Sequence, residues 1–107
     1  MERRRLADAR QFKPDKLAKN NLFQTERLFY DVYCLMPGQS QKVHSHASSD
    51  KVYLVLTGTA RVLVGTEEAE LGPEEAVLCP AGVPHGVAND GPEPATLLVV
   101  AAPPPSA

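Results

Sequence analysis

The sequence has no large excess of charge of either sign and no long apolar run. Its 11 Lys and Arg residues stand against 13 Asp and Glu residues, which gives a net charge of -2. The chain therefore lacks the basic footprint of a nucleic-acid-binding protein. No stretch approaches the roughly 20 apolar residues of a membrane span, and no apolar signal-peptide core follows the basic residues 3–5. We expect no nucleic-acid partner, no membrane partner and a cytoplasmic location.

The sequence also has little cysteine. Its two cysteines, Cys34 and Cys79, lack the close spacing of a zinc knuckle or a redox pair. Both stand within apolar runs, VYCLM and AVLCP. We interpret them as small buried hydrophobic residues that remain free thiols in a reducing compartment.

Helical periodicity is absent from any segment of useful length, whereas short strand patterns recur along most of the chain. Gly and Pro punctuate these patterns at regular intervals, as in an all-β sandwich or barrel. The 107 residues suit a single domain. A domain of this size has a modest core. The strand candidates are residues 28–36, 41–46, 51–58, 59–65, 66–71, 76–80, 85–89 and 95–101.

Three parts of the chain differ in character. Residues 1–27 carry no clear period and are predicted to hold a short strand or helical turn and to contribute dimer contacts. Residues 28–102 are predicted to form the β-barrel, and residues 103–107 a Pro-rich tail that cannot extend a sheet. Within the barrel, residues 28–36 are apolar at odd and even positions alike except for Asp31. This pattern predicts a strand that is covered on both faces.

Two stretches carry the features of a metal site. In the first, Gly38 is followed after five residues by His44, then by His46 and later by Gly58. Residues two apart on a strand project from the same face, so the two imidazoles are expected to point together. The second stretch is PAGVPHGVAN, which contains His85 and ends at Asn89.

Together these stretches resemble the two motifs of the cupin superfamily, G-x5-H-x-H-x(3–4)-E-x6-G and G-x5-P-x-G-x2-H-x3-N. The resemblance covers about residues 28–102 and is closest to small single-domain conserved-barrel (cupin 2-like) proteins. It implies a double-stranded β-helix, or jelly-roll, barrel. It also implies that His44, His46 and His85 bind a divalent metal ion inside the barrel. Imidazole ligands suit Fe, Zn, Ni or Cu, and Mn is a further candidate.

The chain departs from these motifs at two positions. Six residues before Gly58, the acidic ligand is replaced by Lys51, with Asp50 one residue earlier. The simplest alignment points Lys51 into the barrel, whereas a bulge would be needed to make Asp50 a fourth ligand. Tyr53 would share the inward face with Lys51, so both are catalytic candidates. Glu74 replaces the leading glycine of the second motif.

Three functions are compatible with these residues. The first is a metal-binding barrel that acts on or binds a small anionic molecule. If it is an enzyme, it would be a metal-dependent cupin of the dioxygenase, isomerase or decarboxylase type. The second is a metal-free, non-catalytic barrel that binds a small ligand. The third is a metal-free epimerase or isomerase in which a histidine and Lys51 exchange protons. The small core and the habit of the family also predict a homodimer.

Overall fold

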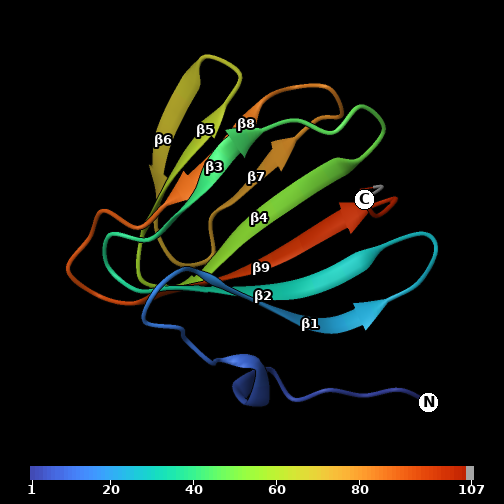
Figure 1. The fold of residues 1–107 in the computed structure, drawn as a ribbon, viewed down its shortest axis with the longest axis horizontal. Helices are drawn as coiled ribbons and strands as arrows, with labels where there is room; N and C mark the ends of the chain where they lie inside the picture. Colours follow the sequence, from blue (N-terminus) through green and yellow to red (C-terminus); the bar gives the residue numbers. More distant parts are fainter. Residues whose placement is uncertain (106–107) are drawn as a thin grey trace.

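The computed structural model describes residues 1–105. These residues form two facing antiparallel β-sheets and one short 3-10 helix (Figure 1). The larger sheet has five strands in the order β1-β2-β9-β4-β7, and the smaller sheet has four in the order β3-β8-β5-β6. The all-β prediction is therefore confirmed. Within the described residues, no helix is long and apolar enough to cross a membrane.

The predicted strands after residue 27 each overlap one observed strand. Their bounds differ from the predicted ones by a few residues at most, because Gly and Pro mark the turns in both. The elements in chain order are η1 Leu6–Ala9, β1 Ala18–Gln24, β2 Phe29–Leu35, β3 Ser40–His44, β4 Asp50–Thr57, β5 Ala60–Val64, β6 Glu67–Leu71, β7 Ala76–Cys79, β8 His85–Ala88 and β9 Ala95–Ala102.

Strand β2 is covered on both faces, which explains why its sequence does not alternate. Tyr33 and Leu35 point into the main core between the two sheets. Val32 and Cys34 lie on the opposite face, in a second cluster that includes apolar side chains of residues 6–12. Figure 1 shows this N-terminal segment lying against the outer side of the larger sheet. Both cysteines are buried free thiols, as the sequence predicted.

The N-terminal segment provides both a helical turn and a strand. Its strand, β1, pairs with β2 of the same chain and forms one edge of the larger sheet. The β1–β2 register shifts between Asn21 and Phe23. Because this irregularity breaks the period of two, the sequence of the strand shows no clear alternation. Dimer contacts of this segment stay a prediction.

Several turns adopt positive φ angles, and two of these positions bear on the motifs. Gly58 has a φ of +77°, and a Cβ there would lie 2.5 Å from the carbonyl oxygen of Pro94, so only glycine fits. Glu74 has a φ of +70° between β6 and β7. The backbone at Glu74 therefore has the positive φ that glycine, the residue of the motif at this position, adopts easily.

Strand β9 reaches Ala102, where the predicted Pro-rich tail begins. The first residues of the tail leave the sheet, and Pro104 and Pro105 lie at the mouth of the cavity described below. The remaining tail residues, 106–107, lie outside the described part of the chain.

Candidate metal centre

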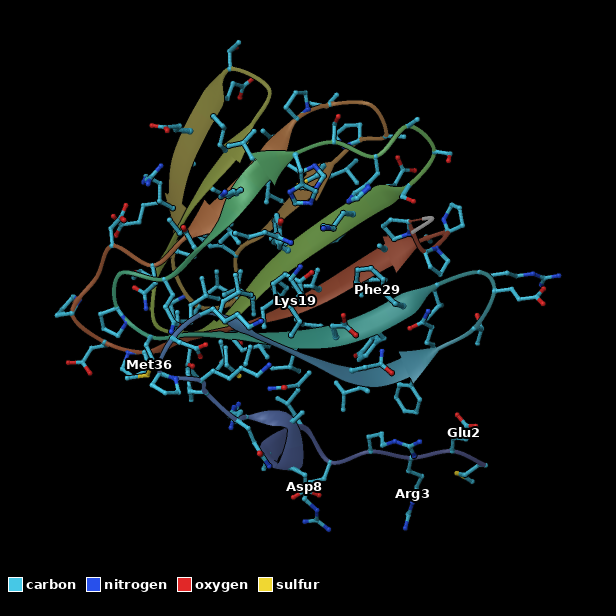
Figure 2. All side chains as sticks on the ribbon, viewed as in Figure 1. Glu2, Arg3, Asp8, Lys19, Phe29 and Met36 are labelled. Atoms are coloured by element: carbon cyan, nitrogen blue, oxygen red, sulfur yellow. The ribbon has the colours of Figure 1, made fainter. Side chains whose placement is uncertain are left out.

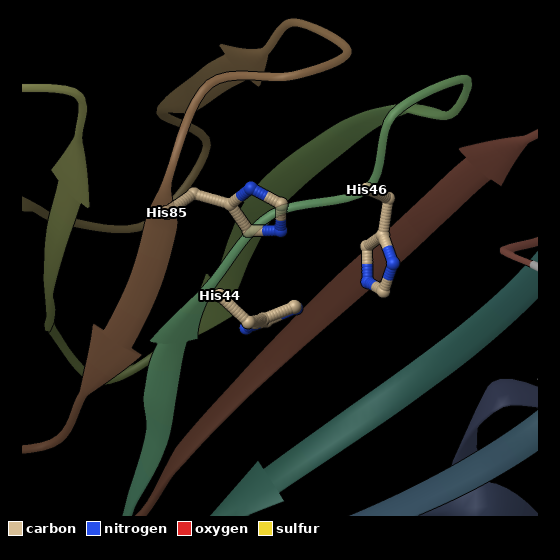
Figure 3. Close-up of side chains that lie close together, drawn as sticks. All are labelled: His44, His46 and His85. Carbon is tan, nitrogen blue, oxygen red and sulfur yellow. The ribbon is translucent and has the colours of Figure 1, made fainter.

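The three histidines meet between the two sheets although they come from separate segments. His44 ends β3, His46 follows in the next loop, and His85 begins β8. His44 and His85 are direct cross-strand neighbours in the β3–β8 register. One ring nitrogen of each histidine lies within 4.8 Å of the other two. Figure 3 shows the three rings grouped around one point.

Backbone carbonyls orient two of the rings. The Nδ1 atom of His44 lies 2.7 Å from the carbonyl oxygen of Lys42, and that of His85 lies 3.1 Å from the carbonyl oxygen of Val83. A carbonyl only accepts hydrogen bonds, so each Nδ1 carries the proton and donates it. Each Nε2 atom therefore carries the lone pair, which is free in His85 and faces the Nζ atom of Lys51 at 3.4 Å in His44. Metal-binding histidines are commonly oriented by this type of contact.

The Nε2 atom of His85 is a buried polar atom without a partner. His85 is 1% exposed, and among the described residues its Nε2 is the one buried side-chain nitrogen or oxygen that lacks a hydrogen bond. An unpaired buried polar atom costs about 1–3 kcal/mol and needs an explanation. A metal ion at the centre of the three imidazoles would provide one, so the residues present fit a metal.

All three imidazoles are biased toward the neutral form that binds metals. Burial lowers the pKa of His85 to about 4, against the opposing effect of its hydrogen bond to Val83. Burial likewise lowers the pKa of His44 and, with a smaller contribution from the neighbouring His44, that of His46. The three rings are thus expected to be neutral at pH 7.

Lys51 occupies the inward position on β4, and Asp50 the outward one. Lys51 is 2% exposed, and its Nζ lies 3.4 Å from Nε2 of His44. Asp50 and Lys51 face Ala102 and Ala101 in an unbroken register, without the bulge that would turn Asp50 inward. The Asp50 carboxylate instead accepts a hydrogen bond of 2.8 Å from the Ala81 amide. The structure therefore places Lys51, and not Asp50, beside the histidines.

The match to known proteins covers the same part of the chain as these site residues. A model of the cupin domain family matches residues 31–101. The chain belongs to the cupin family. Among curated proteins, none matches it.

Solved structures agree with this cupin fold. The chain is 53% identical to TT1209 from Thermus thermophilus, with a TM-score of 0.95 over 98% of this chain and 100% of that one. It is 22% identical to a conserved double-stranded β-helix protein of Klebsiella pneumoniae, with a TM-score of 0.88 over 96% and 90% of the two chains. A predicted oxalate decarboxylase from Thermotoga maritima shares the fold, at 17% identity and a TM-score of 0.78 over 82% and 81%.

In this cupin, burial destabilises the ammonium form of Lys51 without removing its charge at pH 7. Burial lowers the pKa of Lys51 to about 8, and the positive charge of Lys19 acts in the same direction. At pH 7 the ammonium form still prevails. Within residues 1–105, no carboxylate oxygen lies within 4.0 Å of its Nζ. The cupin site thus combines three imidazoles that could hold a metal ion with a cation that has no carboxylate partner.

Tyr53 packs against one of the three histidines, His85. Its side chain is fully buried, and its hydroxyl donates a hydrogen bond of 2.8 Å to the side-chain oxygen of Gln41. Its ring packs edge-on against that of His85, at a centroid distance of 6.1 Å. Burial raises the pKa of Tyr53. These contacts fit a positioning residue, and a catalytic role for Tyr53 stays a prediction.

His44 and His46 line a cavity of about 460 Å³. Sequence reasoning did not place several of its lining residues, because neither the position of β1 within residues 1–27 nor the path of the tail was predicted. Three of them matter for binding: Lys19 on β1, Phe29 on β2 and Pro104 in the tail. Lys19 is placed in the cavity by its pairing with Tyr33, which the sequence alone does not show. The complete lining is Lys19, Gln24, Phe29, Asp31, Tyr33, Gln41, Lys42, His44, His46, Lys51, Pro104 and Pro105.

Proposed function

We propose that this cupin is a small-molecule-binding protein in which His44, His46 and His85 hold a divalent metal ion and Lys51 holds an anionic group of the ligand. The observation that carries the proposal is the unpaired Nε2 atom of His85. Its tautomer is fixed by Val83, and two further imidazoles converge on the same point. Fe, Zn, Mn, Ni and Cu are the candidate ions.

A charged Lys51 opposes the binding of a metal ion alone. At an effective dielectric constant of about 20, an ammonium group about 4 Å from a dication is repelled by about 8 kcal/mol. A carboxylate, enolate or phosphate between the two charges would offset this repulsion. We therefore expect the ion and the anionic ligand to bind cooperatively, each raising the affinity for the other.

An enzymatic activity of this site would be of the metal-dependent dioxygenase, isomerase or decarboxylase type. When bound, the metal ion would supply a Lewis acid that polarises an oxygen of the ligand. The chain's own residues have separate tasks. Lys51 would bind and orient the anionic group, and the hydroxyl of Tyr53, held by Gln41, would keep its ring beneath His85.

A second candidate function needs no metal ion. The Nζ atom of Lys51 lies 3.4 Å from Nε2 of His44, a geometry in which the two groups can share a proton. A metal-free epimerase or isomerase could use them as an acid–base pair. A metal-free, non-catalytic barrel could use them only to hold an anion.

The direct experiment is elemental analysis of protein purified without an affinity tag, followed by thermal unfolding with added Fe²⁺, Zn²⁺, Mn²⁺, Ni²⁺ or Cu²⁺. Each titration is repeated in the presence of succinate, a small carboxylate that serves as the anionic ligand. We expect bound metal, or a rise in the melting temperature with at least one ion. His46→Ala should abolish the rise. Val43→Ala is the control, since Val43 is 55% exposed on the same strand as His44.

If no ion is retained and none raises the melting temperature, with or without succinate, the metal proposal is rejected. Isomerisation or epimerisation by that metal-free protein would then support the acid–base alternative. Ligand binding without turnover would support the non-catalytic barrel.

We also propose that the protein is a homodimer. The outer face of the larger sheet supports this, because Val52 and Leu78 are register partners there and are 36% and 56% exposed. Exposed apolar neighbours on one sheet face suit an interface with a second copy. Light scattering should give twice the mass of the chain, and a clean monomer would reject the dimer.

A further inference from the structure

Two lysines that line the cavity lie over a packed pair of tyrosines. Lys19 pairs with Tyr33 in the β1–β2 register, and its Nζ lies 5.6 Å from the centre of the Tyr33 ring. The Nζ of Lys51 lies 5.7 Å from the centre of the Tyr53 ring. The two rings pack edge to face, with centroids 6.4 Å apart. Both ammonium groups therefore lie on the same wall of the cavity.

These lysines lack an anionic partner. In the described part of the chain, both salt bridges belong to Arg61, and no carboxylate oxygen lies within 4.0 Å of Lys19 or Lys51. Asp31 shares the cavity, but its carboxylate accepts a hydrogen bond of 2.7 Å from Asn21. With Lys42 also lining the cavity, three lysines stand against one aspartate. This excess of positive charge favours an anion.

The space between the polar groups is partly apolar. Phe29 and Tyr33 line it from β2, and Pro104 lines it from the tail. Figure 2 shows Lys19 and Phe29 over the face of the larger sheet that looks toward the smaller one. A short carbon chain can pack against such a wall while its charged ends reach polar groups.

We propose that Lys19 and Lys51 together select a ligand with two separated anionic groups, of which a dicarboxylate is the simplest. One group would bind at Lys51 beside the histidines and the second at Lys19. The proposal rests on the proposed function for the first anionic group at Lys51 and for the metal ion as an additional contact of that group, whereas the second group at Lys19 is independent of it. Lys19 lies outside residues 31–101, which match the family model, so this selectivity would be a property of the chain's N-terminal strand.

The test is isothermal titration calorimetry with pairs of acids that differ by one carboxylate. Malonate, succinate and glutarate are compared with propionate, butyrate and valerate, which carry a methyl group instead. Each pair is titrated into protein with and without saturating Zn²⁺. We expect at least one dicarboxylate to bind about tenfold more tightly than its partner, the size of effect that one charge-assisted contact provides.

Lys19→Met should remove most of this preference and leave the affinity for the monocarboxylate unchanged. Lys16→Met is the matched control, since it removes the same charge from an exposed bend that does not line the cavity. Circular dichroism and thermal unfolding verify that each variant is folded.

Several results would overturn the proposal. These are equal binding of both acids in every pair, no binding of any acid, or an equal loss in Lys19→Met and Lys16→Met. If Zn²⁺ does not bind, the metal proposal fails, but the titrations without Zn²⁺ still decide the role of the lysine pair. If Zn²⁺ binds and the preference is absent, the metal proposal stands and this one is rejected.

Discussion

The two ends of strand β8 carry buried polar residues with opposite hydrogen bonding. Asn89, just beyond the end of the strand, is fully buried and donates to the carbonyl oxygens of Leu35 and Glu93 at 2.9 and 2.8 Å. Its side-chain oxygen accepts a hydrogen bond of 3.0 Å from Gly91. His85, at the start of the strand, is 1% exposed and leaves Nε2 unpaired.

This difference separates structural from functional polar groups. The side-chain contacts of Asn89 connect the end of β2 with the loop of residues 91–93, so the fold itself uses both polar atoms of the amide. The fold uses only Nδ1 of His85, and the remaining nitrogen faces a cluster of two more imidazoles. A polar group that costs stability without a ligand is a reasonable marker of a binding site.

The largest expected effect is that of Asn89→Ala on stability. The substitution leaves the buried carbonyl of Leu35 without its Asn89 donor and removes the bonds to Glu93 and Gly91. We expect the free energy of unfolding to fall by about 3 kcal/mol. Urea denaturation measures this, and metal titration of the folded fraction should show an unchanged affinity. A loss below about 1 kcal/mol would mean that Asn89 is not a structural anchor.

His85→Leu should have the opposite profile. Because it removes an unpaired nitrogen, we expect the unfolding free energy of metal-free protein to change by no more than about 1 kcal/mol. Metal affinity should fall by at least about 100-fold, since one of three ligands is lost. Urea denaturation and metal titration measure the two quantities. Full metal affinity in the variant would show that His85 is not a ligand.

Lys51→Glu tests the functional site of the comparison, where Nε2 of His85 is unpaired. It replaces an opposing charge with a carboxylate at the acidic position of the motif, so metal affinity should rise by about tenfold or more. Lys16→Glu changes the net charge equally and lies in an exposed bend, which makes it the control. Competition with a chromogenic chelator measures the affinity. An unchanged affinity in Lys51→Glu would place Lys51 outside the reach of the ion.

The fold was largely predictable because turn residues and strand patterns agree along residues 28–102. Strand β1 was only expected as a short strand or helical turn without bounds, since the adjacent apolar residues Leu22 and Phe23 break the alternation at the point where its register shifts. With β1 missing, Lys19 could not be placed in the cavity. The choice between Lys51 and Asp50 depended on a bulge, and register becomes visible only when strands are paired.

The tautomers of His44 and His85 could not be predicted either. They depend on the carbonyl oxygens of Lys42 and Val83, which lie two residues earlier in the chain in both cases. A spacing of two residues does not by itself show that a ring turns back toward the backbone. The motif indicated which residues gather at the site, whereas the backbone path around each ring determines which nitrogen is free.

The smallest expected effect concerns the hydroxyl pair of Thr57 and Thr96, a structural contact of 2.6 Å between β4 and β9. Thr96 is 2% exposed, whereas Thr57 lies at the surface. Thr57→Val should therefore cost about 1–2 kcal/mol, because it leaves the buried hydroxyl of Thr96 unpaired. Thr96→Val should cost less, because water can solvate Thr57. The double variant should recover most of the loss in a urea-denaturation cycle. Equal costs of the two single variants would show that burial does not determine what an unpaired polar group costs in this barrel, and the interpretation of His85 would lose its physical basis.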